Sequence, residues 1–298
     1  MQAAPRHTSP RDLSGLWTNA TLTPLERPPG FNGLVTTEAA AADFEKRRPA
    51  EFLASGSEGV GARESEFWEL GTRMTRVRGE IRTSIIIDPR DGKLPYSEAG
   101  RRLLATAAAG MLAATEGPEV RPSPERCLMG GGGASGVPMF AANYNANYLF
   151  VQTADHLAIW SEMGGSVRII PLTKRSPLPP HIRPWMGDSA SHWEGNTLVV
   201  ETRNFNPAES HKIPAPIYVS QDAVVTERFT RLSPMEVLYD FSVDDPKPFT
   251  RPWRGEGIFR ASKGPMFESA CHEGNYSLPG ILAGARREEG AGRRAESQ

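Results

Sequence analysis

The sequence predicts a mainly β protein, built as an antiparallel up-and-down barrel or a sandwich, with two or three peripheral helices. Short segments rich in β-branched and aromatic residues recur at near-regular spacing after residue 147. Several of these segments alternate between two kinds of side chain, which is typical of strands with two different faces. The chain also has 26 prolines and 29 glycines, which favour many turns over long helices.

The first half of the chain is expected to mix strands with helices. Residues 11–18 and 79–88 have the composition of strands, and a Pro-Arg-Asp-Gly turn ends the second one. Thr37 and Ser97 can each cap a helix N-terminus, and we expect the two helices to reach about residues 48 and 114.

Two segments of this half are expected to be loops. Residues 49–65 are small and polar, and we interpret them as a mobile loop before a structured block that begins at Phe67 and Trp68. Residues 130–136 formally contain the G-x-G-x-x-G spacing of a dinucleotide site. That site needs a strand before the glycines and a helix after them, whereas no strand precedes here and Pro138 follows at once.

The second half is predicted to be a β-meander. Glu194-Gly195-Asn196 and Ser233–Glu236 are turn signals between β-branched runs. Residues 182–194, ahead of the first of these runs, are interpreted as a loop. The expected strands are residues 148–153, 157–162, 167–172, 198–203, 224–232, 237–243, 257–261 and 266–270.

One β-rich domain should therefore cover residues 11–283, with strands, two helices and loops over 11–137 and the meander over 138–283. Residues 1–10 are interpreted as a disordered start. Residues 284–298 are charged and poor in apolar side chains, which predicts a disordered tail.

Composition narrows the class of partner. A net charge of −1 argues against nucleic acid or an anionic membrane, because both call for a basic excess. No apolar run approaches the roughly eighteen residues of a membrane span. A small molecule is the expected partner, and the oligomeric state stays open. The start MQAAPRHTSP resembles a mature chain after signal cleavage, which predicts a periplasmic or secreted protein; the alternative is a cytosolic protein with a frayed start.

The two cysteines, Cys127 and Cys271, fit an exported protein if they form a disulfide, although two buried free thiols are the alternative. Neither has a second cysteine or a closely spaced histidine pair around it, and the six histidines are scattered. We therefore expect no metal site and no cofactor.

The best acid–base set lies between Asp188 and Glu194. His192 can exchange a proton near neutral pH, and a carboxylate beside it, from Asp188 or Glu194, would orient the ring. The alternative is structural, with Asp188 forming a turn, His192 exposed and Glu194 opening a hairpin. His272 is the fourth catalytic candidate, because it ends the last expected strand and could face the same rim.

Aromatic and arginine side chains near these positions could bind a ligand. Arginine beside tryptophan can hold an anionic or aromatic molecule, although it can equally form a structural cation–π pair. Glu162 and Arg168 face each other across a predicted hairpin and could pair, either at the surface or inside a barrel. The candidate substrate-binding residues are Arg183, Trp185, Trp193, Arg251, Trp253 and Tyr276.

Five motifs occur in order along the chain: Asp12–Trp17 (DLSGLW), Glu125–Gly130 (ERCLMG), Trp185–Thr202 (WMGDSASHWEGNTLVVET), Val243–Trp253 (VDDPKPFTRPW) and Ala270–Tyr276 (ACHEGNY). In these motifs the chain resembles a family of exported bacterial proteins with no assigned activity. The resemblance implies export and pairing of the two cysteines. In this chain Glu162-Met163 is followed by two glycines, where the family pattern often has a histidine. If the family shares a chemistry that needs this histidine, this chain would act differently.

Gly15-x-Trp17 also resembles the first strand of lipocalin-like barrels, in which the tryptophan plugs one end; the alternative is a tryptophan packed on the core. We therefore predict an exported, cofactor-independent enzyme of the lyase, isomerase or hydratase type, acting on a small apolar or aromatic molecule by acid–base chemistry. The alternative is a non-catalytic, lipocalin-like binding protein. Geometry separates them, because an enzyme should gather Asp188, His192 and His272 around a cavity.

Overall fold

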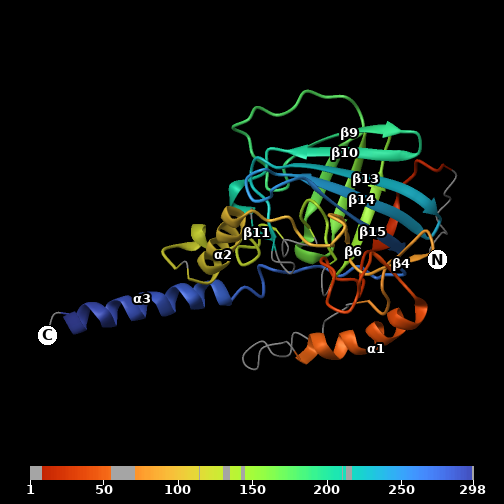
Figure 1. Cartoon of the computed structure of the whole chain (residues 1–298). Coiled ribbons are helices and arrows are strands. Elements are labelled where there is room, and N and C mark those ends of the chain that lie inside the picture. Colours follow the sequence, from red (N-terminus) through yellow and green to blue (C-terminus); the bar gives the residue numbers. More distant parts are fainter. Residues whose placement is uncertain are drawn as a thin grey trace.

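The computed structural model of the chain describes residues 9–54, 71–113, 115–129, 135–141, 145–209, 211–212 and 217–296. Its main element is a strongly curved antiparallel sheet in the order β8-β7-β6-β1-β15-β14-β13-β10-β9, which nearly closes into a barrel (Figure 1). The predicted mainly β architecture with peripheral helices is confirmed. The strands of this sheet are β1 (Gly15–Thr18), β6 (Asn147–Gln152), β7 (His156–Ser161), β8 (Val167–Pro171), β9 (Asp188–Glu194), β10 (Thr197–Arg203), β13 (Val224–Ser233), β14 (Glu236–Asp244) and β15 (Trp253–Ala261).

The N-terminal strand holds the two arms of the sheet together. Strands β6, β7 and β8 form one meander, and strands β9, β10, β13, β14 and β15 form the other. In β1, Trp17 is opposite Tyr148 of the first arm and Ala261 of the second. The Trp17 ring is buried and its indole N–H donates to the Leu13 carbonyl at 3.0 Å. A strand from the start of the chain thus completes a sheet formed by its second half.

The opposite seam, between β8 and β9, is closed by side chains. No ladder pairs these two strands among the described residues. Instead, the Ser191 hydroxyl of β9 donates to the Pro171 carbonyl of β8 at 2.6 Å, and the Arg168 guanidinium donates to the Ser189 hydroxyl at 3.1 Å. These contacts hold β8 and β9 beside each other, so the sheet nearly closes into a barrel.

The barrel interior is filled by alternate side chains of the strands, as the period of two requires. On β14, Val237, Tyr239, Phe241 and Val243 are all buried and share one face. Aromatic rings dominate this core: Tyr239 lies 5.5 Å from Phe259 and 5.3 Å from Phe241, measured between ring centroids. Edge-to-face and tilted contacts of this kind add to the stability from area burial alone.

Short strands and helices surround the barrel. One small sheet contains β2 (Val35–Thr36), β3 (Arg76–Val77) and β4 (Glu80–Arg82), and a second contains β11 (His211–Lys212) and β12 (Ile217–Tyr218); β5 (Ile86–Asp88) pairs with β15. The helices are α1 (Glu38–Ala54), α2 (Glu98–Ala113) and α3 (Ser277–Glu296), with 3-10 turns η2 (Pro118–Val120), η3 (Met163–Gly165) and η4 (Pro207–Glu209).

The caps predicted for α1 and α2 are present. The Thr37 hydroxyl accepts the Ala40 N–H at 3.3 Å, and the Ser97 hydroxyl accepts the Gly100 N–H at 2.9 Å. These bonds satisfy backbone donors that the first helical turn leaves free. The Ser97 N–H also donates to the Pro248 carbonyl at 2.9 Å, which attaches the start of α2 to the segment after β14.

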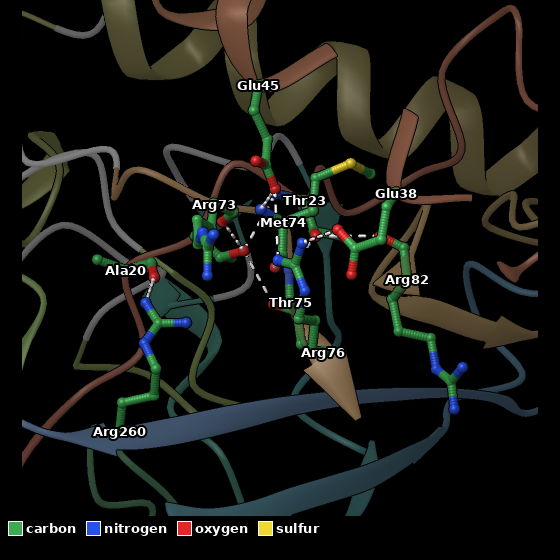
Figure 2. A network of polar contacts seen from close by, with 11 residues as sticks. Ala20, Thr23, Glu38, Glu45, Arg73, Met74, Thr75, Arg76, Arg82 and Arg260 are labelled. Carbon is green, nitrogen blue, oxygen red and sulfur yellow. Dashed lines mark hydrogen bonds and ion pairs between the residues drawn. The ribbon is translucent and has the colours of Figure 1, made fainter. Parts of the chain in front are cut away.

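Polar contacts attach the N-terminal elements to one another and to the barrel (Figure 2). A Glu45 carboxylate oxygen of α1 accepts the Met74 N–H at 2.7 Å, and Glu38 of the same helix pairs with Arg76 of β3 at 2.7 Å. Arg260 of β15 donates to the Ala20 carbonyl, and this contact holds the segment after β1 against the barrel wall. Residues 20–23 are thereby placed close to β15.

Local expectations differ from the structure at several places. Residues 79–88 form two short strands, because the Thr83 N–H donates to the Leu34 carbonyl and the Ser84 hydroxyl to the Ile86 carbonyl. Residues 266–270 form no strand; the Phe267 N–H donates to the Glu162 carboxylate at 2.9 Å. Residues 188–194, expected in a loop, form β9. Residues 49–54, expected at the start of a loop, belong instead to α1. Residues 1–8, 55–65 and 130–134, which carry the other loop predictions, lie outside the described residues, as do residues 67–68, which were expected to begin a structured block.

A further difference is the C-terminal segment, where helix α3 occupies much of the region predicted to be disordered and extends away from the sheet (Figure 1). Low apolar content does not prevent a helix, since alanine, arginine and glutamate have high helix propensity. Arg286 and Glu289 also form an i,i+3 ion pair at 2.7 Å.

The disulfide between Cys127 and Cys271 is present, with an S–S distance of 2.02 Å. It joins the segment after η2 to the segment after β15 across a sequence separation of 144. A loop of this length corresponds to an upper limit of about 4–5 kcal/mol in the chain-entropy model. No helix in the described part of the chain is long and apolar enough to cross a membrane.

Candidate functional site

The residues predicted to carry acid–base chemistry lie on strand β9, which pairs with β10 along its whole length. Because successive side chains of a strand point to opposite faces, Asp188, His192 and Glu194 share one face and Ser189 the other. Ser189 is buried inside the barrel, whereas the His192 side chain is 64% exposed. The candidate set therefore faces away from the barrel interior.

Asp188 has a structural set of contacts. Its carboxylate forms an ion pair with Arg175 and accepts the Leu178 N–H at 2.8 Å. These bonds attach the segment that follows β8 to the start of β9. Gly187, just before it, has a φ of +73° and lies against the backbone of Arg203, so the turn into β9 requires glycine here.

His192 and Glu194 belong to a surface chain of polar contacts. The His192 Nε2 atom lies 3.1 Å from a Glu194 carboxylate oxygen, and Arg228 of β13 donates to the other oxygen at 2.8 Å. The hydrogen bond from Arg228, followed by that from His192, lowers the pKa of Glu194. All three side chains are exposed, which limits what their interaction contributes.

His272 lies next to the disulfide and is exposed. Among the described residues, no hydrogen bond or ion pair joins Asp188, His192 and His272. The structure therefore does not form the cluster expected of the acid–base enzyme. The catalytic role of each residue stays a prediction.

The substrate-binding candidates are dispersed. Trp253 is fully buried in the core, with its ring 5.6 Å from that of Phe241. Trp193 is half-buried beneath the Arg11 guanidinium, 5.5 Å from its ring centroid, which matches the structural cation–π alternative. Tyr276 is 83% exposed.

The two arginine candidates bind other parts of the chain. Arg183 donates to the Gln221 carbonyl at 3.0 Å, and Arg251 pairs with Asp88 at 2.9 Å on the surface. Trp185 is half-buried beside Arg183 in the sequence. None of these six side chains lines the cavity described below.

A buried polar network inside the barrel is the feature that the sequence reasoning missed. Arg168 of β8 donates to both carboxylate oxygens of Glu227 on β13, at 3.0 and 2.5 Å. The same guanidinium donates to the Ser189 and Thr202 hydroxyls at 3.1 and 2.9 Å. Arg168 is 5% exposed and Glu227 is fully buried. The sequence did contain a sign that Glu227 is buried, because Glu227 and the apolar Phe229 are two positions apart and so share one face of the strand.

The predicted contact between Glu162 and Arg168 is not formed. Glu162 is buried, and its carboxylate accepts the Asn147 side-chain amide at 2.7 Å and the Phe267 N–H at 2.9 Å. Arg168 points instead to Glu227, fifty-nine positions along the chain. The partner of Arg168 was therefore predicted wrongly, because the prediction considered only residues close in sequence across one hairpin.

Tyr239 connects this network to a cavity. Its hydroxyl donates to Glu227 at 2.7 Å and accepts the Met139 N–H at 2.9 Å. Burial, followed by the nearby Glu227 charge, raises the pKa of Tyr239 well above its usual value. The ring of Tyr239 forms part of the cavity wall.

The cavity has a volume of about 590 Å³ and lies where β15 changes its neighbour. Arg254 and Gly255 of β15 pair with β5, whereas Arg260 and Ala261 pair with β1. Gly257, Ile258 and Phe259 lie between these two ladders and line the cavity. The lining residues are Asn19, Thr21, Leu22, Thr23, Pro24, Leu25, Glu26, Arg48, Thr75, Ile85, Leu94, Tyr96, Arg101, Leu104, Met139, Phe140, Ala141, Tyr239, Phe241, Gly257, Ile258 and Phe259.

The cavity lining contains both apolar and charged side chains. Phe140, Phe241 and Phe259 are each at most 5% exposed and supply the apolar wall. Arg48 of α1 and Arg101 of α2 are more exposed and bring positive charge to the lining. The cavity therefore offers both an apolar surface and cationic groups to a bound molecule.

Glu26 and Tyr96 complete the polar lining. The two carboxylate oxygens of Glu26 accept the Leu94 N–H at 2.8 Å and contact the Lys93 ammonium at 3.3 Å. The Tyr96 hydroxyl accepts the Tyr218 N–H at 2.9 Å, and burial raises the pKa of Tyr96 to about 12. Both groups are thus engaged by the chain itself.

No group of three or more histidine, cysteine, aspartate or glutamate side chains is arranged to hold a metal ion in the part of the chain that the structure describes. Comparison of the chain with protein-family models, with curated proteins and with solved structures finds no match.

Proposed function

We propose that the protein is an exported small-molecule-binding protein whose ligand occupies the cavity beside β15. Its size supports this proposal, because ligand sites commonly have volumes of about 300–1,000 Å³ and mostly apolar walls. The disulfide between Cys127 and Cys271 and the family resemblance support export. The outward position of His192 favours binding over the acid–base chemistry predicted for β9.

The observation that carries the proposal is the cavity beside the part of β15 that lies between the β5 and β1 ladders. A barrel whose core was filled at this point would have no room for a ligand. Here the space reaches Tyr239, Phe241 and Phe259, which all lie on the inner face of the sheet. A ligand could therefore be buried on most of its surface while it enters through the wall.

Gly257 provides the test. It lines the cavity, and a Cβ atom added there would meet nothing within 4 Å. Gly257→Val therefore fills part of the cavity without a clash, and a β-branched residue suits a strand. The matched control is Thr226→Val, which places a valine on the outer face of β13.

The measurement is a fluorescence titration with N-phenylnaphthylamine, a neutral aromatic probe. We expect saturable binding to the native chain, a dissociation constant raised at least roughly tenfold by Gly257→Val, and no change for Thr226→Val. Urea unfolding of both variants checks that the fold is retained. Absence of saturable binding, or equal binding by Gly257→Val, contradicts the proposal.

Acid–base catalysis is the second candidate function, and one observation favours it. Tyr239 lines the cavity and is hydrogen-bonded to the buried carboxylate of Glu227. Any turnover found with small apolar substrates should then be lost in Tyr239→Phe and kept in His192→Ala. The reverse result would place the chemistry on the outer face of β9, as the sequence predicted.

A further inference from the structure

We propose that the ligand of this cavity is an uncharged molecule, with an aromatic or aliphatic body and a hydroxyl group that hydrogen-bonds to the side-chain amide of Asn19. This inference rests on the proposed function and names its ligand class. It is carried by two features of the cavity lining: a polar side chain that the chain leaves without a partner, and charged side chains that the chain or the solvent already satisfies.

Asn19 is the residue of the lining whose polar atoms the chain does not satisfy. Its Oδ1 atom is buried and has no hydrogen-bond partner in the described part of the chain, and no other residue given above for the lining has such an atom. A buried acceptor without a partner is costly to the folded state and calls for an explanation. Because Asn19 lines the cavity, a bound molecule can supply the missing partner.

A second unsatisfied group lies beside Asn19. Asn19 directly follows β1 and stays paired with β6, because its N–H donates to the Ala146 carbonyl at 3.3 Å. Trp17, two positions earlier, is opposite Tyr148, so Asn19 and Tyr148 share the inner face of adjacent chain segments. The Tyr148 hydroxyl is also buried without a hydrogen-bond partner. Burial raises the pKa of Tyr148 and the Asn19 side chain lowers it, so the hydroxyl keeps its proton and lies near the amide.

A hydroxyl group suits this position because it can both donate and accept a hydrogen bond. Rotation of the Asn19 amide about its Cβ–Cγ bond exchanges its oxygen and its NH₂ group. The amide can therefore offer either end to the cavity and turn the other toward Tyr148. A ligand hydroxyl forms a hydrogen bond in both arrangements, whereas a hydrocarbon forms none.

The charged side chains of the lining do not call for a charged ligand. Glu26 has the Lys93 ammonium at 3.3 Å as its counter-ion. Arg48 already interacts with another residue of the chain. Arg101 donates to a backbone carbonyl at 3.2 Å and is exposed, so water can solvate its charge. An ionised ligand would therefore lose its hydration against the apolar wall without a dedicated counter-charge, which is costly.

Three naphthalenes that differ at one position separate these contributions. 1-Naphthol is uncharged at neutral pH and carries a hydroxyl, 1-methylnaphthalene has neither a charge nor a hydroxyl, and 1-naphthoate is an anion. Each is titrated against bound N-phenylnaphthylamine, whose displacement gives the dissociation constant. We expect 1-naphthol to bind the native chain at least roughly tenfold more tightly than 1-naphthoate.

Asn19→Leu assigns the contribution of the hydroxyl to the amide. The dissociation constant of 1-naphthol should rise by roughly 3- to 10-fold, because one hydrogen bond is lost, while that of 1-methylnaphthalene should stay within roughly twofold. The urea midpoint should stay equal or rise, because an apolar group of similar size replaces an acceptor without a partner. Asn19→Ala removes the amide without adding bulk and should show the same selectivity, which keeps the test valid if leucine does not fit.

Asn206→Leu is the matched control. The Asn206 side chain donates to the Arg183 carbonyl at 3.3 Å and accepts the Ala208 N–H at 3.0 Å, and it does not line the cavity. Its urea midpoint should therefore fall, while its dissociation constants for 1-naphthol and 1-methylnaphthalene should equal those of the native chain. The opposite responses of the two variants distinguish a ligand-binding asparagine from a structural one.

The outcomes separate this inference from the proposed function. If N-phenylnaphthylamine binds and Gly257→Val weakens it, but Asn19→Leu changes 1-naphthol and 1-methylnaphthalene equally or changes neither, the inference is overturned and the cavity remains an apolar site. Tighter binding of 1-naphthoate than of 1-naphthol overturns it as well, and so does a urea midpoint that falls as far in Asn19→Leu as in Asn206→Leu. If N-phenylnaphthylamine does not bind, or Gly257→Val leaves its binding unchanged, the proposed function itself fails.

Discussion

Replacing Glu227 by glutamine should destabilise the barrel strongly, because it removes the only carboxylate that Arg168 contacts in the described chain. Glu227 Oε1 accepts from Arg168 and from Tyr239, at 3.0 and 2.7 Å, and Oε2 accepts from Arg168 at 2.5 Å. In Glu227→Gln one of these oxygens becomes an NH₂ group that faces a donor. The Arg168 guanidinium then stays buried without a counter-charge, and its Nε atom already has no hydrogen-bond partner.

The expected magnitude follows from the burial of both partners. Breaking a buried ion pair by removing one charge costs about 3–5 kcal/mol, because the remaining charge is not solvated. The Ser189 and Thr202 hydroxyl oxygens accept hydrogen bonds from Arg168 but carry no charge. We therefore expect the free energy of unfolding to fall by about 3–5 kcal/mol in Glu227→Gln.

The assay is urea unfolding of the oxidised protein, followed by fluorescence, with the slope of the transition checked for constancy. Glu194→Gln is the control, because Glu194 also pairs with an arginine on β13 but is exposed, and its midpoint should move little. Adding Arg168→Met to Glu227→Gln should restore more than about 1 kcal/mol, since the unpaired charge is gone. A loss below about 1 kcal/mol in Glu227→Gln, or no recovery in the double variant, would refute the reasoning.

Two further predictions concern α2 and β9. A Cβ atom at Gly100 would lie 2.0 Å from the Pro248 carbonyl, so Gly100→Ala should lower the free energy of unfolding by about 1–3 kcal/mol. Gly280→Ala is the control and should not lower it, because a Cβ atom there would meet nothing within 4 Å. Equal urea midpoints for the two variants would show that α2 does not dock as described. Arg228→Gln should raise the pKa of Glu194, because the main cause of its lowering is removed, and carboxyl NMR titration measures it. A lowered carboxyl pKa contributes stability that is present above the usual value of 4.5 and is lost as pH falls through the folded-state pKa. The free energy of unfolding of Arg228→Gln should therefore depend less on pH in the acid range. An unchanged titration of Glu194 would contradict the assignment.

Local patterns in the sequence determined most of the strands and the helix starts. The alternation along Val224–Ser233 and Glu236–Asp244, with a turn signal between them, is sufficient to predict the hairpin that the structure contains. Thr37 and Ser97 were identified as caps because capping depends on residues within one helical turn. These features could be predicted because their causes lie within a few positions of each other.

The candidate site depended on contacts that no local pattern contains. Asp188–Glu194 is polar enough to suggest a loop, and only its pairing with β10 makes it a strand and turns His192 outward. Arg168 and Glu227 meet because β8 and β13 face the same interior, which their sequence positions do not indicate. The cavity lies beside the part of β15 between its pairing with β5 and its pairing with β1, and the chain order says nothing of that change. Strand register between distant segments is a property of the whole barrel, so only the tertiary structure could decide where its interior, its outer face and its opening lie.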